Sequence, residues 1–257
     1  MSKCDQEVGT RTRRCCSLRK VHEFQEARDI DSILAAMRRL LSHGVVQQLG
    51  SAALKQIALD TEDQTLIFGA GSVRGVMDAM RRHKRHAGVQ GAGCGVLCNV
   101  GVVAEHKQGI AWCGGIETVV EALREHPQRV AVQKQGLSAL RILAVDEQVA
   151  LKVANGGGIQ LMADAMRTLP ENAKVQQRAC RALLQIGWPD AGVQARIRER
   201  GGFDLVERAL RAPGATDKCR AGTTVRSFLC CHQNDLILSV ICPTRQLLRY
   251  TPPSNQT

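Results

Sequence analysis

Aromatic side chains are scarce in this chain, which has four Phe, two Trp and one Tyr among its 257 residues. A stacking platform for single-stranded nucleic acid needs aromatic rings, so this composition argues against that kind of binding. Hydrophobic residues nevertheless make up 44% of the chain. We therefore expect a core of Leu, Val, Ile, Ala and Met, as helical repeat proteins use.

Long apolar runs are absent as well. No stretch approaches the roughly 20 apolar residues that a membrane-crossing helix needs. The first twenty residues contain arginines and cysteines but no apolar segment of the kind found in secretory signals. We expect an intracellular protein, in the cytoplasm or alternatively the nucleus, whose 11 cysteines are reduced thiols.

Patterns that carry catalysis or metal binding are missing. The sequence shows no nucleophile–base pair, no paired carboxylates and no metal triad. Cys94 and Cys98 lie four residues apart, and two ligands do not make a zinc site. After Gly69-Ala-Gly71 the third glycine of a nucleotide-binding turn is misplaced, and no strand precedes the segment. We expect no enzymatic activity, no cofactor and no bound metal.

A looser group of four cysteines and one histidine lies near the C-terminus. We interpret this region as a poorly ordered tail, and a zinc site is the alternative. No paired C-x₂-C spacing supports that alternative. The group consists of Cys219, Cys230, Cys231, His232 and Cys242.

Positive charge is in excess, with a formal net charge of +11. Residues 1–21 contain six basic and two acidic side chains, and residues 214–257 contain five and two. Basic tails can bind nucleic acid or anionic lipid, although most are merely solvated.

A repeated segment dominates what is present. It reads VQQLGSAALKQI from Val46, VQGAGCGVLCNV from Val89, VQKQGLSALRIL from Val132 and VQQRACRALLQI from Val175, an interval of 43 residues each time. A fixed interval of this size is typical of repeat proteins that stack into a solenoid. Within each copy the apolar residues have helical spacing, which predicts one α-helix per copy.

Two further helices are predicted in each unit. A middle helix begins near Ile30 and ends near Leu41, and its pattern recurs from Val73, Ile116, Ile159 and Phe203. A glycine step precedes each later copy, and a short segment anchored by one apolar residue precedes the step. These anchors are Ile67, Ile110, Val153 and Ile197. Glycine suits such a step because it readily takes the left-handed conformation.

Glycine also recurs inside the repeated third helix, at Gly50, Gly93 and Gly136, with Ala179 in the fourth copy. Glycine within a helix costs roughly 0.5–1 kcal/mol relative to alanine. Its recurrence predicts a steric demand, such as a neighbouring helix that crosses closely. The cysteines in the next position, Cys94 and Cys180, are expected to be small packing residues.

The units divide the chain into a flexible basic leader at 1–21, a repeat domain at 22–229 and an irregular tail at 230–257. The repeats lie near 30–72, 73–115, 116–158 and 159–202, with a partial copy at 203–229. In the partial copy, a last third helix is predicted around 221–228. Pro127 and Pro170 are expected to stop two middle helices, and the loop histidines His83 and His126 are expected to have no chemical role.

The three-helix unit, with VQ-x₂-G-x₃-L on its third helix and a GGI turn before the middle helix, resembles the armadillo repeat. Its sequence pattern is closest to the armadillo blocks of leucine-rich-repeat kinases and of small armadillo-only proteins. The resemblance implies an all-α, right-handed superhelix whose third helices line a concave groove for extended peptides. In importin-like members a Trp and an Asn clamp the peptide; Asn99 matches the Asn, and Gln56 and Gln185 are amide substitutes. The Trp position is occupied by other residues, which argues against nuclear-signal binding.

Helix geometry predicts which side chains face this groove, because they lie opposite the Val/Gly/Leu face. The central part should be small and open, at Gly91 and Gly95, and the C-terminal half basic. The predicted groove residues, amide substitutes included, are Gln48, Lys55, Gln56, Gly95, Asn99, Lys134, Ser138, Arg141, Gln177, Arg181 and Gln185.

We therefore expect a monomeric, non-enzymatic scaffold that binds an acidic or extended segment of a protein partner, with Lys134, Arg141 and Arg181 supplying charge. One alternative is an adaptor whose basic tails bind nucleic acid or a membrane surface. Another is a regulatory fragment of a larger kinase-like protein.

Overall fold

The computed structural model describes residues 28–144, 147–187 and 191–211, and within these ranges it contains thirteen helices and no strand. The predicted all-α class is confirmed. No helix in these ranges has the length and apolar character needed to span a membrane. The predicted leader, the last third helix around 221–228, the tail and its cysteine group lie outside the described residues.

The predicted unit of short, middle and third helix recurs along the described chain. The middle helices are α2 (Ile30–Arg39), α5 (Ser72–Arg82), α8 (Gly115–Glu125), α11 (Gly158–Thr168) and α14 (Gly202–Arg211). The third helices are α3 (Gly44–Ile57), α6 (Ala87–Val100), α9 (Val130–Leu143) and α12 (Ala173–Gly187). The short helices are α4 (Thr61–Gly69), α7 (Ala104–Trp112), α10 (Glu147–Asn155) and α13 (Ala191–Glu199).

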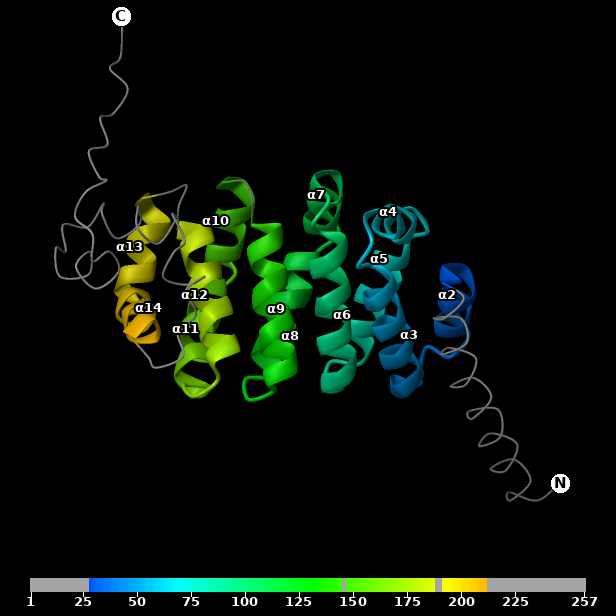
Figure 1. The fold of residues 1–257 in the computed structure, drawn as a ribbon, viewed down its shortest axis with the longest axis horizontal. Helices are drawn as coiled ribbons and strands as arrows, with labels where there is room; N and C mark the ends of the chain where they lie inside the picture. The colour runs from blue at the N-terminus through cyan, green and yellow to red at the C-terminus, as the bar shows by residue number, and fades with distance from the viewer. Residues whose placement is uncertain (1–27, 145–146, 188–190, 212–257) are drawn as a thin grey trace, which may run out of the picture.

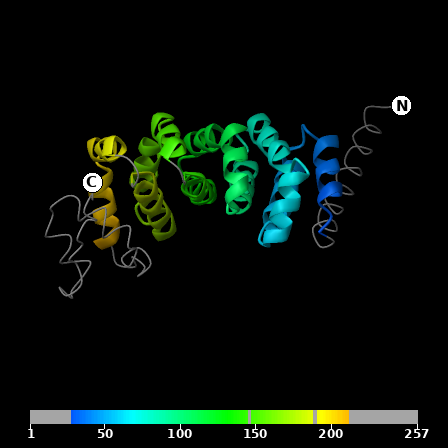
Figure 2. The same cartoon turned by 90° about the horizontal axis from the view of Figure 1, so that it is seen from above.

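Equivalent helices of successive units pack beside one another. Helix α3 contacts α6, α6 contacts α9 and α9 contacts α12, while each of the middle helices α2, α5, α8 and α11 contacts its own third helix and the next middle helix. The result is an elongated row with α2 at one end and α13 and α14 at the other (Figures 1 and 2). We call the four adjacent third helices the third-helix layer. It is the surface on which the predicted groove residues lie.

Each recurring glycine of a third helix lies where the last apolar side chain of the middle helix crosses it. A Cβ atom at Gly93 would lie 2.6 Å from Cγ of Met80, and one at Gly136 would lie 2.6 Å from Cδ2 of Leu123. Gly50 is buried in the same way. The predicted close crossing is therefore confirmed, and the absent Cβ is what permits it.

The predicted helix ends are also confirmed. Each glycine step before a middle helix has a residue with positive φ, at +72°, +85°, +85° and +68° for Gly71, Gly114, Gly157 and Gly201 respectively. Helix α8 ends at Glu125, just before Pro127, and α11 ends at Thr168, just before Pro170. Proline cannot donate a backbone hydrogen bond and its ring clashes with the preceding turn, so a helix stops there.

The glutamine of the repeated VQ pair ties the third helix to the end of the middle helix. Nε2 of Gln90 donates to the carbonyl oxygens of Met80, at 2.8 Å, and His83, at 3.0 Å. The last carbonyl groups of a helix have no partner within it, and this side chain supplies one. The same pair of bonds is made by Gln47, Gln133 and Gln176.

Histidine side chains join the loops of successive units. Nε2 of His83 lies 2.7 Å from the carbonyl oxygen of Leu41, and Nε2 of His126 lies 2.7 Å from that of Lys84. The two rings therefore hydrogen-bond to equivalent backbone positions one unit back, and each is a link between neighbours.

The centre of the row should be sensitive to loss of packing. Leu140 in α9 has no exposed surface, and truncating such a leucine to alanine removes apolar contacts and leaves a cavity. We expect Leu140→Ala to lower the free energy of unfolding by about 2–5 kcal/mol in a urea titration followed by circular dichroism. Val102→Ala, at a 55% exposed position, should change it by no more than about 0.5 kcal/mol. Equal effects would contradict the burial of Leu140.

Removing the Gln133 side chain should also destabilise the fold, because two buried carbonyl groups lose their partner. We expect Gln133→Ala to lower the free energy of unfolding by about 1–3 kcal/mol in the same titration. Gln108→Ala, at an exposed position of α7, is the matched control. A loss at Gln133 no larger than at Gln108 would show that these bonds contribute nothing.

Candidate functional site

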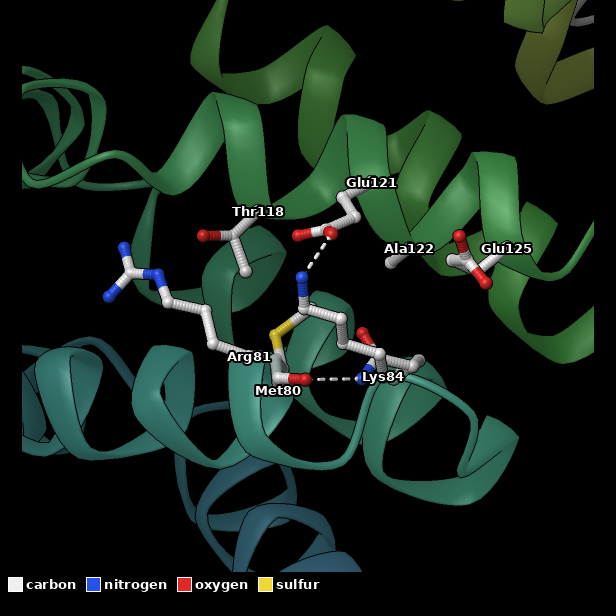
Figure 3. A pocket seen from close by; sticks show the side chains of 8 residues that line it. Met80, Arg81, Lys84, Thr118, Glu121, Ala122 and Glu125 are labelled. Carbon is white, nitrogen blue, oxygen red and sulfur yellow. Dashed lines mark hydrogen bonds and ion pairs between the residues drawn. The ribbon is translucent and has the colours of Figure 1, made fainter.

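A hollow between the middle helices α5 and α8 does not have the form of a ligand site. It contains about 180 Å³, open solvent included, which is below the 300–1,000 Å³ usual for small-molecule pockets. An ion pair of 2.6 Å between Nζ of Lys84 and Oε1 of Glu121 crosses it (Figure 3). Within the described ranges, no three His, Cys, Asp or Glu side chains are grouped so that they could hold a metal ion.

The third-helix layer differs from the rest of the described chain in its charge. Its four helices contain no Asp and no Glu. Their charged residues are Lys55, Lys134, Arg141, Lys174, Arg178 and Arg181. Ion pairs between described residues lie instead on the middle and short helices and their loops, for example Arg81 with Asp78 and Arg167 with Asp164. Positive charge on the third-helix layer is thus left without negative charge of its own.

Three of these bases come together where α9 and α12 pack. Nη1 of Arg178 donates to the carbonyl oxygen of Lys134, at 2.7 Å, and to Oγ of Ser138, at 2.8 Å. Arg141 follows Ser138 by one helical turn, and Arg181 follows Arg178 by one turn, so all lie on adjacent faces. We call Arg141, Arg178 and Arg181 the arginine cluster.

Partial burial lowers the pKa of Arg141, and the nearby positive charges of Arg181 and Arg178 lower it further. Burial disfavours the charged form of any base, and a like charge does the same. Arg141 remains a cation at neutral pH because an arginine pKa starts far above it. Burial is the larger cause of this lowered pKa, and the like charges of Arg181 and Arg178 add to it.

The structure brings four of the predicted groove residues together at this point and adds one that the sequence did not single out. Lys134, Ser138, Arg141 and Arg181 surround or form the cluster. Arg178 was missed, because the residues predicted on α12 were Gln177, Arg181 and Gln185. Its signal was the spacing of basic residues at 174, 178 and 181, which is i, i+4 and i+7 on one helix face.

The centre of the layer differs from the expected open surface. Gly95 is buried, and a Cβ atom there would lie 3.0 Å from Cγ of Lys55 and 3.7 Å from Cδ of Gln135. Gly91 is buried as well, with the backbone of α9 3.7 Å from its Cβ position. Side chains and backbone of the flanking helices therefore cover these glycines, and this part of the prediction was wrong.

The remaining predicted residues are amides at different depths. Nδ2 of Asn99 donates to the carbonyl oxygen of Lys55 at 2.9 Å, so this amide links α6 to α3. Gln56 is exposed, whereas Gln48, Gln177 and Gln185 are half-buried. Gln56 on α3 is therefore the most accessible amide on the predicted face.

The cysteines of the described chain differ in accessibility. Burial raises the pKa of Cys94 to about 12, so this thiol is neutral at physiological pH. Burial also raises the pKa of Cys98, although Arg141 and Arg178 act in the opposite direction. Cys94 and Cys180 are buried, which confirms that they are packing residues, and Cys113 is exposed.

These differences in burial and pKa predict different alkylation rates, because the thiolate is the reactive form. With iodoacetamide at pH 8, we expect Cys113 to react first among the four described cysteines and Cys94 roughly a hundredfold or more slowly, since a raised pKa leaves less thiolate at that pH. Peptide mapping by mass spectrometry would measure each site, and the rates should converge in guanidinium chloride. Equal rates in the folded protein would contradict the burial of Cys94.

No family model matches the chain, and no curated protein matches it. It resembles crystal structures of engineered proteins from the Northeast Structural Genomics Consortium. One has a TM-score of 0.63 at 21% identity, over 88% of this chain and 99% of the other. A second has a TM-score of 0.65 at 18% identity, over 83% of this chain and 93% of the other. A third has a TM-score of 0.64 at 20% identity, over 86% of this chain and 54% of the other. At these identities the likeness shows the helical fold alone, and the armadillo resemblance stays a prediction.

Proposed function

We propose that this protein is a non-enzymatic interaction scaffold of the armadillo type that binds an extended, acidic segment of a partner protein along its third-helix layer. The observation that carries the proposal is the charge of this layer, which has six bases and no acid in four helices. The armadillo resemblance supports it, because that family uses this layer as a concave groove.

The packing of the helices favours a long surface over a closed pocket. Contacts between α3, α6, α9 and α12 run from neighbour to neighbour along the row. Repeat proteins built in this way present extended surfaces, and those surfaces are what they use to bind partners. A partner segment that crosses several third helices in turn would fit this arrangement.

The arginine cluster gives the surface its preference for acidic segments. A half-buried guanidinium without a counter-ion is unfavourable, because it has lost part of its hydration and is repelled by its neighbours. Carboxylates of a bound segment would supply the missing negative charge through charge-assisted hydrogen bonds. Arg141 and Arg181 are the members best suited to this role, since Arg178 is partly engaged by Lys134 and Ser138.

Single-stranded nucleic acid is a weaker candidate for the same surface. The four third helices contain no Phe, Tyr or Trp. Proteins that bind single strands stack bases on aromatic rings, and this contribution would be missing here. A protein segment needs only the charges and amides that the layer offers.

Reversing two charges on the layer tests the proposal. We expect Arg141→Glu combined with Arg181→Glu to weaken binding of a fluorescein-labelled Glu-rich peptide at least about tenfold, because attraction becomes repulsion. The measurement is fluorescence anisotropy with the full chain, and capture of partner proteins from a cell lysate should fall in parallel.

The matched control is Arg39→Glu combined with Arg74→Glu, two exposed arginines on the middle helices α2 and α5. It changes the net charge by the same amount and should leave peptide binding within about twofold, since these sites lie outside the layer. If both double variants lose binding equally, the net charge of the chain determines peptide binding and the position of the arginines does not. If neither changes peptide binding or capture, the assignment of this surface is wrong.

A further inference from the structure

We propose that the arginine cluster receives a phosphorylated side chain of the partner segment. This inference rests on the proposed function and specifies it, since it names the group that the most basic point of the layer recognises. The observation behind it is the convergence of three guanidinium groups where the described residues provide no carboxylate.

Arg178 is held in position by two hydrogen bonds. Its Nη1 is held by the carbonyl oxygen of Lys134 and by Oγ of Ser138, so the planar group is oriented across the junction of α9 and α12. Donors on its Nε and Nη2 have no acceptor among the described residues. A guanidinium that is oriented before binding loses less side-chain freedom when an anion arrives.

The positive charge of the arginine cluster favours a phosphate over a carboxylate. One carboxylate carries a single negative charge and pairs with one guanidinium through two parallel hydrogen bonds. A phosphorylated side chain carries about −1.5 to −2 charges at pH 7 and three strong acceptor oxygens. Arg141, Arg178 and Arg181, with Lys134 about two turns before Arg141 on α9, match the phosphate better than they match a lone carboxylate.

The third helices around the arginine cluster supply no negative charge. Cys98 of α6 is near enough to Arg141 and Arg178 for their charges to act on its thiol. Burial outweighs their effect and raises the pKa of Cys98, so the thiol is neutral and does not serve as a counter-ion. The neighbouring third helices provide no acidic residue either. A bound dianion would therefore meet no repulsion from these helices.

The source of the phosphate is a peptide, for two reasons. The layer has no aromatic ring on which a base could stack. Its basic residues are concentrated on α9 and α12, whereas α3 contributes only Lys55 and α6 none. A nucleic-acid backbone carries charge at every step, but this layer has most of its charge at one end and a single lysine at the other.

Three pools of short, fluorescein-labelled peptides test the inference, with a central phosphoserine, Glu or Ser and degenerate neutral flanks. Binding to the full chain is measured by anisotropy. We expect the phosphoserine pool to bind about tenfold more tightly than the Glu pool. Arg178→Lys keeps the charge but removes the planar set of guanidinium donors. The preference for the phosphoserine pool over the Glu pool should therefore fall to about twofold or less.

Arg74→Lys, on α5, is the matched control and should keep the full preference. If Arg178→Lys lowers the thermal unfolding temperature, Arg181→Lys at an exposed position replaces it with the same expectation. Equal binding of the phosphoserine and Glu pools would overturn this inference and leave the proposed function standing. Failure of both pools to bind would overturn both. Tighter binding of a short single-stranded oligonucleotide than of the phosphoserine pool would overturn the assignment to a peptide.

Discussion

The crossing of each middle helix over its third helix is the contact on which the rest of the structure depends. Where Met80 crosses Gly93 and Leu123 crosses Gly136, the absence of a Cβ atom lets the two helices approach closely. Because the crossing recurs in each unit, successive third helices take equivalent positions relative to their middle helices. Their alignment in one layer follows, and with it the assembly of basic side chains from separate units into one surface.

Much of the fold could be predicted because each unit repeats its signals. The interval of 43 residues, the apolar spacing and the glycine steps specified the helices and most of their ends. The role of the VQ glutamine could not be predicted in the same way. Recurrence shows that a residue matters, but Gln90 acts through carbonyl groups of another helix, and a sequence pattern does not show which backbone groups lack partners.

The candidate site was predictable only as far as a single helix determines it. Helix geometry placed Lys134 and Arg141 on one face, and the structure brings them near Arg181. It failed at Gly95, since Lys55 and Gln135 from the flanking helices lie over that glycine. It also missed Arg178, whose position depends on acceptors in α9. Contacts between helices decide both cases.

The glutamine bonds have a consequence for how this array tolerates changes in length. Each glutamine follows its two acceptor residues by 10 and 7 positions in all four units. Inserting a residue in that stretch would pull the amide away from both acceptors at once. The one extra residue among the aligned units falls elsewhere, between Ile186 and Gly201, after a third helix and before the next middle helix. Insertions and deletions among relatives should therefore accumulate at that junction, while the stretch bridged by glutamine keeps its length.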